Sequence, residues 1–456
     1  MHVRVGRCAL LAVFVLGFWH DGSATELAVD LPPGLQTPEA AMPGPEFDVE
    51  QATQAYLGLL SPEQRERSNE YFEGGYWLQL WGFLYGLAVL LAILALHWSA
   101  RMRDWAERVT SRRWLQTALY ALIFTPLVWL LSLPLAWYAG FAREHAYGLS
   151  NHTFGGWLWD EFKGMLMVTV LAAIAIVSIY AFIRRARASW WAWATGFMFA
   201  FLLFVILITP VFLNPIFNTY QPLDDGPVRS AVLSLARANE IPADNVMWFD
   251  ASKQTKRISA NVAGLFGTTR VSLNDNLLER TSLPEIKAMM GHEMGHYVLN
   301  HLLQGAVFFT LLFGLGFLIL DRVFEIARRR LGERFGIREC ADPAGLPLAL
   351  AIMSAFLFLA TPLINRYIYS GEHAADLYGL NAAREPHGFA TVAMRLGAYR
   401  KLEPSPLEEF LFYDHPSGRR RVEMSMRWLK ENQALISSAA SSQAFGSRVD
   451  TAAGTQ

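Results

Sequence analysis

The chain has 456 residues, of which 53% are hydrophobic and only 17% are charged. Soluble globular chains carry about 25% charged residues, so this composition indicates a membrane protein. The net charge of -1 gives no electrostatic basis for binding nucleic acid. The two cysteines, Cys8 and Cys340, exclude a disulfide framework and a cysteine-based zinc site, so a metal ion would need histidine and carboxylate ligands.

Residues 1–24 have the pattern of a secretory signal peptide. Two arginines precede the apolar run Cys8–Trp19, and small residues suited to cleavage follow it. The run is short for a membrane span, although an uncleaved first membrane anchor is the alternative. Residues 25–77 are rich in proline and acidic residues and more helical from Ser61, and we interpret them as a spacer.

Six longer apolar runs follow, four within residues 78–213 and two within residues 303–367. They cover Leu78–His97, Leu115–Tyr138, Gly164–Ile183, Trp191–Leu213, Leu303–Leu320 and Leu348–Tyr367. Each reaches the roughly 18–20 residues that cross a bilayer as a helix, and tryptophans gather at their ends as interfacial anchors do. Buried helices of a large soluble protein would not account for six such runs. The sequence therefore predicts a multi-pass membrane protein.

Arginines are concentrated in the loops after the first, third and fifth runs. The loop after the second run, residues 139–163, has only Arg143 and Lys163. The positive-inside rule places the arginine-rich loops in the cytoplasm. The long segments 214–302 and 368–456 are then expected on the non-cytoplasmic face, which agrees with a cleaved signal peptide.

The polar region 214–302 is predicted to combine helices with short strands. Val228–Asn239 has the pattern of an amphipathic helix. The β-branched and aromatic stretches typical of strands are Val246–Asp250, Arg257–Ala263 and Thr269–Leu273, with a turn at Gly264 and Gly267. Residues 368–436 are expected to be mostly helical, and the Ser/Ala/Gly-rich tail 437–456 to be disordered.

An H-E-x-x-H pentad, His292-Glu293-Met294-Gly295-His296, follows a capping-box pattern at Ser282–Glu285. Residues four apart share one face of a helix, so both imidazoles can hold one zinc ion, with Glu293 placed to act on its water. The pattern also arises by chance, and two unrelated histidines on a helix are the alternative. We expect this helix to continue into the fifth run.

A zinc ion on two histidines needs a third protein ligand. His301 lies five residues after His296, about 140° round a helix, and is interpreted as an ordinary interfacial histidine. The best candidate is Glu372, and Asp376 on the same helix face could orient a ligating imidazole. Acidic pairs on helices more often face solvent. Here, however, the fifth and sixth runs form an antiparallel hairpin, which brings His296 and Glu372 to the same membrane surface.

Further motifs accompany the pentad along the chain. In order, they are Glu144–Asn151 with Thr153, Asn214–Phe217, Pro222-Leu223, Lys256-Arg257 with Ser259 and Asn261, Gly371–Asp376 and Asp414-His415-Pro416. Together they resemble the type I CaaX prenyl proteases and, more distantly, the HtpX-like proteases, over about Glu66 to Lys430. The fold expected is mainly α, a polytopic membrane helical bundle with a small α+β zinc metallopeptidase region of gluzincin-like type.

The resemblance implies one Zn2+ per chain, held by His292, His296 and Glu372, with Glu293 as general base. It implies further roles for Asp376, as an orienting residue or proton donor, for His415, in stabilising the oxyanion, and for Arg421 and the substrate-binding Asn261. Taken alone, His415 is more typical of a turn before proline, and the strand around Asn261 could be purely structural. Two departures from the family are Arg420, where glutamate is usual, and Asn261-Val262-Ala263, where an aromatic residue usually follows Asn-Ala.

The predicted function is a membrane-embedded zinc metalloendopeptidase that acts on a peptide or protein substrate within the lipid bilayer environment, with no nucleic acid partner. The resemblance favours C-terminal cleavage of prenylated CaaX proteins. The predicted orientation favours instead the quality control or processing of membrane or exported proteins, as in HtpX-type proteases. A catalytically dead membrane scaffold or a transporter is the alternative of another class, although the spans carry almost no central charges. The sequence indicates no oligomeric state.

Overall fold

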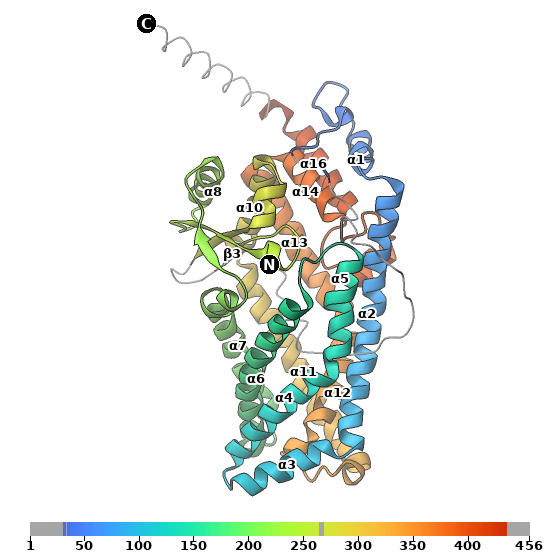
Figure 1. The fold of residues 1–456 in the computed structure, drawn as a ribbon, viewed down its shortest axis with the longest axis vertical. Coiled ribbons are helices and arrows are strands. Elements are labelled where there is room, and N and C mark those ends of the chain that lie inside the picture. Colours follow the sequence, from blue (N-terminus) through green and yellow to red (C-terminus); the bar gives the residue numbers. More distant parts are fainter. Residues whose placement is uncertain (1–30, 33, 264–268, 436–456) are drawn as a thin grey trace.

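The computed structural model describes residues 31–32, 34–263 and 269–435. The predicted signal peptide or anchor (1–24), the turn at Gly264 and Gly267 and the tail (437–456) lie outside these residues. The described part is an elongated helical bundle that carries a mixed α/β region at one end (Figure 1).

Five helices in the described ranges are long and apolar enough to cross a membrane, and they confirm the first five predicted spans. They are α2 (Pro62–Ala95), α4 (Arg113–Trp137, extended by η3 at Tyr138–Ala142 and α5 at Arg143–Ala146), α6 (Phe154–Arg185), α7 (Trp190–Ile208, extended by η4 at Thr209–Leu213 and η5 at Asn214–Ile216) and α11 (His301–Phe335). A short helix, α3 (Trp98–Val109), connects α2 to α4 at the end of the bundle opposite the mixed region (Figure 1).

The sixth predicted span is divided into two helices. After the turn η7 (Pro343–Gly345), α12 (Leu346–Leu359) and α13 (Thr361–Ala383) meet at a bend of 54°. Pro362 explains the break, since proline has no backbone N–H and its ring clashes with the carbonyl of the preceding turn. Helix α13 then runs into the mixed region, where it packs along α10 (Leu283–Val298).

The helix that carries the pentad, α10, does not continue into the fifth span, so that prediction is wrong. It ends at Val298, and Asn300 adopts a left-handed conformation (φ 55°, ψ 34°) before α11 begins at His301. Asparagine tolerates this conformation better than most residues. Helix α11 is also longer than predicted, because five of the six arginines expected in the following loop lie on its C-terminal turns.

The mixed region contains a four-stranded sheet in the order β1-β2-β4-β3. Its strands are β1 (Tyr220–Pro222), β2 (Val246–Phe249), β3 (Ala260–Ala263) and β4 (Arg270–Asn274). β2 and β4 are parallel, and the other two pairs are antiparallel. The three predicted strands are confirmed, whereas β1 was not expected because three residues that include a proline carry no periodic signal. Strand β3 lies at one edge of the sheet and contacts α10.

Further helices complete the region. They are α8 (Pro227–Ala238), α9 (Asp275–Arg280), α14 (Pro386–Leu396), α15 (Pro406–Phe412) and α16 (Gly418–Glu431), with the short turn η6 at Ala251–Lys253. Of these helices, α8 and α9 contact the sheet. The amphipathic pattern at 228–239 is thus confirmed as α8. Its Val232 packs with Leu273 of β4 and with Ile286 and Met290 of α10 in a shared apolar core, which fixes the pentad helix on the sheet.

The segment ahead of the first span, interpreted as a spacer, packs on the mixed region. It contains η2 (Glu39–Ala41) and α1 (Val49–Leu57), and Tyr56 packs in one core with Met394 of α14 and Met426 of α16. The buried Arg395 donates hydrogen bonds to the carbonyl oxygens of residues 31, 32 and 34. Its Nε also lies 2.5 Å from Oε1 of Glu285, in the first turn of α10, so this segment braces the start of the pentad helix.

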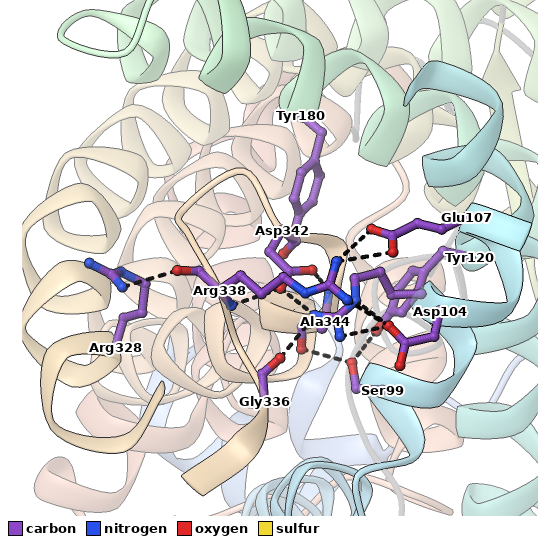
Figure 2. Close-up of polar contacts among 11 residues, drawn as sticks. Ser99, Asp104, Glu107, Tyr120, Tyr180, Arg328, Gly336, Arg338, Asp342 and Ala344 are labelled. Atoms are coloured by element: carbon purple, nitrogen blue, oxygen red, sulfur yellow. Dashed lines mark hydrogen bonds and ion pairs between the residues drawn. The ribbon is translucent and has the colours of Figure 1, made fainter. Parts of the chain in front are cut away.

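A polar cluster lies at the opposite end of the bundle, between α3 and the connection from α11 to α12 (Figure 2). Arg103 Nη1 stands 2.5 Å from Asp342 Oδ2, with both side chains almost completely buried. Arg338 reaches Asp104 and Glu107 at 2.9 and 2.8 Å. We call these five residues the far-end cluster. It ties α3 to the connection from α11 to α12 by ion pairs.

Candidate active site

The site is built where α10 and α13 touch through two glycines. A Cβ at Gly291 would stand 2.9 Å from the carbonyl oxygen of Gly379, and a Cβ at Gly379 would stand 2.7 Å from the backbone nitrogen of His292. Side chains at these positions would push the two helices apart. The glycines therefore allow the backbone of α13 to approach that of α10 directly beside His292.

Three side chains from these helices direct their donor atoms to one point. His292 Nε2 and His296 Nε2 are 3.1 Å apart, and each lies 3.4 Å from an oxygen of Glu372. A tetrahedral ion with bonds of 2.0–2.1 Å separates its ligand atoms by about 3.3 Å. These distances fit such an ion, and a His–His–carboxylate set suits one.

Charged groups behind the donor atoms hold them in place. Asp376 is fully buried, its Oδ1 lies 2.7 Å from His292 Nδ1, and its Oδ2 accepts a hydrogen bond of 2.8 Å from Arg421 Nε. Burial opposes protonation of His292, but the Asp376 and Glu372 carboxylates outweigh it and raise the pKa of His292 to about 9. Burial likewise opposes the charge of Arg421, yet the same carboxylates raise the pKa of that guanidinium above its usual value.

The other predicted site residues lie around this set. Glu293 is half-buried on α10, directly after His292. His415 points its Nε2 at Glu372 Oε2, 3.0 Å away, while its Nδ1 lies 2.7 Å from Asp414. Asn261 is buried on β3, opposite Ser272 of β4, and so belongs to the strand beside α10 rather than to the cluster itself. Arg420, the departure from the family pattern, pairs with the buried Glu409 at 2.6 Å.

Sequence reasoning missed the place of His301. Its Nδ1 lies 2.9 Å from Nδ1 of His296, with the two rings edge to face, so its interpretation as an ordinary interfacial histidine is wrong. A straight helix would have turned the two side chains about 140° apart. The left-handed Asn300 turns the chain so that they meet. An asparagine between two helical patterns was the signal that could have indicated the break.

Two motifs that are distant in sequence also meet beside the site. Arg257, just ahead of β3, lies 2.8 Å from Glu144 Oε2 on α5 and donates a 2.6 Å hydrogen bond to the hydroxyl of Tyr71 on α2. Glu144 also accepts a 2.5 Å hydrogen bond from Tyr71. The loop between early spans is thereby fixed to the strand that leads to Asn261.

Comparisons with known proteins agree with this geometry. Residues 49–219 match the family described as CAAX prenyl protease N-terminal, five membrane helices, and residues 222–428 match peptidase family M48. The chain is 29% identical over 327 residues to the uncharacterized metalloprotease YhfN of Bacillus subtilis, covering 71% of this chain and 76% of that protein. It is also 29% identical over 321 residues to CAAX prenyl protease 1 of Saccharomyces cerevisiae, covering 66% and 70%.

A solved structure shares the fold. The crystal structure of S. mikatae Ste24p superposes with a TM-score of 0.68 at 20% sequence identity, over 85% of this chain and 92% of that one. The two family matches together span the bundle and the mixed region, and neither a scaffold nor a transporter is favoured by them. The chain therefore belongs to the CaaX prenyl protease family of M48 peptidases and is a multi-pass membrane metalloprotease.

Proposed function

We propose that this protein is a zinc metalloendopeptidase whose ion is held by His292, His296 and Glu372. The observation that carries the proposal is the convergence of two imidazole nitrogens and one carboxylate at spacings of 3.1 to 3.4 Å. Three protein ligands leave one position open for water or substrate, as catalytic zinc sites require. The metallopeptidase family supplies the expectation of a metal, and the donor set favours zinc.

The surrounding residues have separate tasks in peptide hydrolysis. When bound, the ion lowers the pKa of water and polarises the scissile carbonyl. Glu293 takes a proton from the attacking water and passes it to the leaving amine. Asp376 holds Nδ1 of His292, so that Nε2 stays free of a proton, and Arg421 neutralises the charge of Asp376.

His415 is assigned to the charge that develops on the substrate. Its side chain is mostly buried and its Nε2 lies at the ligand carboxylate, so a small ring rotation would direct an N–H towards a carbonyl oxygen bound beside Glu372. Donors aimed at that oxygen stabilise the transition state more than the substrate. Arg421 adds positive charge behind the same carboxylate, with its Nη2 3.4 Å from Glu372 Oε2.

Strand β3 is proposed to bind the substrate in an extended conformation. Among the residues that the structure describes, it pairs with β4 alone, and it contacts α10. An edge strand offers backbone N–H and C=O groups that an extended peptide can pair with. Asn261, on this strand, would then lie close to the peptide beside the metal site.

Replacing Glu293 by Gln tests the mechanism. The variant is expected to bind one zinc per chain and to lose at least about 100-fold in kcat, since it removes the general base and leaves the ligands intact. Glu279→Gln, at an exposed position on α9, is the matched control and should keep full activity. Undiminished turnover by the Glu293→Gln variant would remove Glu293 from the mechanism.

The substrate class follows from the relatives and from orientation. Because several relatives are named CAAX prenyl protease 1, we propose a prenylated CaaX peptide as the first substrate to test. Arginine-bearing segments lie at the far end of the bundle from the site (Figure 1), which supports a non-cytoplasmic catalytic face and, as the second candidate, cleavage of membrane or exported proteins.

Two measurements separate these candidates. Purified wild type and the Glu293→Gln variant are compared on a prenylated CaaX peptide and on an unfolded membrane protein, and the preferred substrate is the one with the larger kcat/KM difference. A reporter fused after Gln456 then reports the membrane face. Activity of the reporter only as a cytosolic marker would refute the non-cytoplasmic orientation.

A further inference from the structure

The two imidazoles of the site have different partners on their outer nitrogens. Nδ1 of His292 faces the buried carboxylate of Asp376 at 2.7 Å, whereas Nδ1 of His296 faces the imidazole of His301 at 2.9 Å. Nothing in the mechanism above uses His301. A ring nitrogen at this distance from another ring nitrogen requires that one of them carries the proton and the other accepts it.

We propose that His301 is a positioning residue that sets the tautomer and orientation of His296; this inference rests on the proposed metal site. Since Nε2 of His296 points at Glu372 and His292, it must present a lone pair there, and the ring proton then sits on Nδ1. Nδ1 of His301 accepts this proton in a hydrogen bond. His301 therefore does for His296 what Asp376 does for His292.

Two features hold the ring of His301 in this place. Asn300, in its left-handed conformation, ends α10 and starts α11, so that the side chain of residue 301 folds back onto His296. On the other side the ring lies against Gly371, where a Cβ would stand 3.7 Å from Cε1 and Nδ1 of His301. His301 is thereby packed between the pentad helix and the residue that precedes Glu372.

The chemical consequence is an unequal pair of ligands. A carboxylate partner makes an imidazole a stronger electron donor than a neutral imidazole partner does. With Asp376 on one ligand and His301 on the other, His296 is oriented without a further buried negative charge beside those of Asp376 and Glu372. An ion held by His292, His296 and Glu372 would keep more of its positive charge for water and substrate than it would if both histidines had carboxylate partners.

The test uses the full-length protein in detergent and measures metal affinity by competition with a chelator, together with the absorption spectrum of the cobalt-substituted protein. His301→Leu removes the acceptor and should lower metal affinity about 10- to 100-fold and shift the cobalt bands. In His301→Asn the amide oxygen takes a place close to that of Nδ1, so affinity should stay within about threefold of wild type. His373→Leu, at an exposed histidine beside Glu372, is the control for general perturbation.

Each outcome of these affinity measurements supports or overturns the positioning role of His301. Equal affinity in wild type and His301→Leu overturns the positioning role, and so does an equal loss in the Leu and Asn variants, which would indicate packing alone. If His301→Leu does not fold, Asn300→Val, which disfavours the left-handed turn and keeps His301, must reproduce the affinity loss, while Asn300→Gly must not. Failure of the proposed metal site is distinguishable, since wild type would then bind no ion and Glu372→Ala would change nothing.

Discussion

The candidate active site and the far-end cluster both contain buried charged side chains, but the partners of these side chains differ between the two regions. In the far-end cluster every arginine meets a carboxylate: Arg338 meets Glu107 (Figure 2), and Arg103 meets Asp342. At the site, the two Nε2 atoms and the carboxylate of Glu372 face one another at 3.1 to 3.4 Å. Acceptors gathered in this way require a cation or a proton between them.

The difference shows how a binding site is distinguished from a structural ion-pair network when both are buried. Every charged side chain of the far-end cluster has an ion-pair partner within it, so the removal of one of them should affect folding alone. In our proposal the site is complete only with a bound ion, and its outer residues Asp376, Arg421 and His301 orient the inner ones. Mutations in the two regions should therefore separate metal binding from stability.

The largest expected effect is the loss of metal and activity after a substitution in the candidate active site. Glu372→Ala removes the ligand that closes the set and should abolish stoichiometric zinc and lower kcat/KM by more than about 1,000-fold, because the ion supplies both the activated water and the polarised carbonyl. The zinc content per purified chain measures the loss of the ion, and a peptidase assay measures the fall in kcat/KM. Full zinc content in this variant would show that the ion is held elsewhere.

The corresponding change in the far-end cluster is Asp342→Ala. It removes the buried carboxylate of Arg103, which keeps only the more exposed Asp104 as an ion-pair partner, and it removes the acceptor for the backbone N–H groups of Arg338 and Ala344. Loss of one partner of a buried ion pair costs about 3–5 kcal/mol. Denaturant titration in detergent should show this loss, while zinc content stays at the wild-type level. A drop in zinc content of the folded variant would mean that the two regions are coupled.

The same contrast explains which features the sequence could predict. The membrane spans and the pentad helix depend on composition and periodicity over many residues, so the sequence predicts them. Glu372 was predicted to lie near His296 because two successive spans return the chain to the same membrane surface, which is a topological argument. In each case the signal lies in a long pattern rather than in one side chain.

The features that were missed depend on single residues or on distant contacts. Asn300 ends a helix through its own backbone conformation, and Pro362 divides a run that is long and apolar enough to be predicted as one span. The pairing of Arg103 with Asp342 joins residues 239 positions apart, which no local pattern indicates. The sequence therefore predicted that His292, His296 and Glu372 come together, as the structure has them, but not the contact between His296 and His301.

The smallest expected effect on stability is that of removing an exposed charge, rather than a buried one, from the far-end cluster. The Arg338 side chain is 56% exposed, against 6% for Arg103, although both pair with Asp104. Arg338→Ala should therefore lower the free energy of unfolding by only about 0–1 kcal/mol, and less at high salt, because water screens an exposed pair. Its backbone N–H keeps the hydrogen bond to Asp342 in the variant. A loss as large as that of Asp342→Ala would show that the exposed pairs, and not the buried one, hold α3 against the α11–α12 connection.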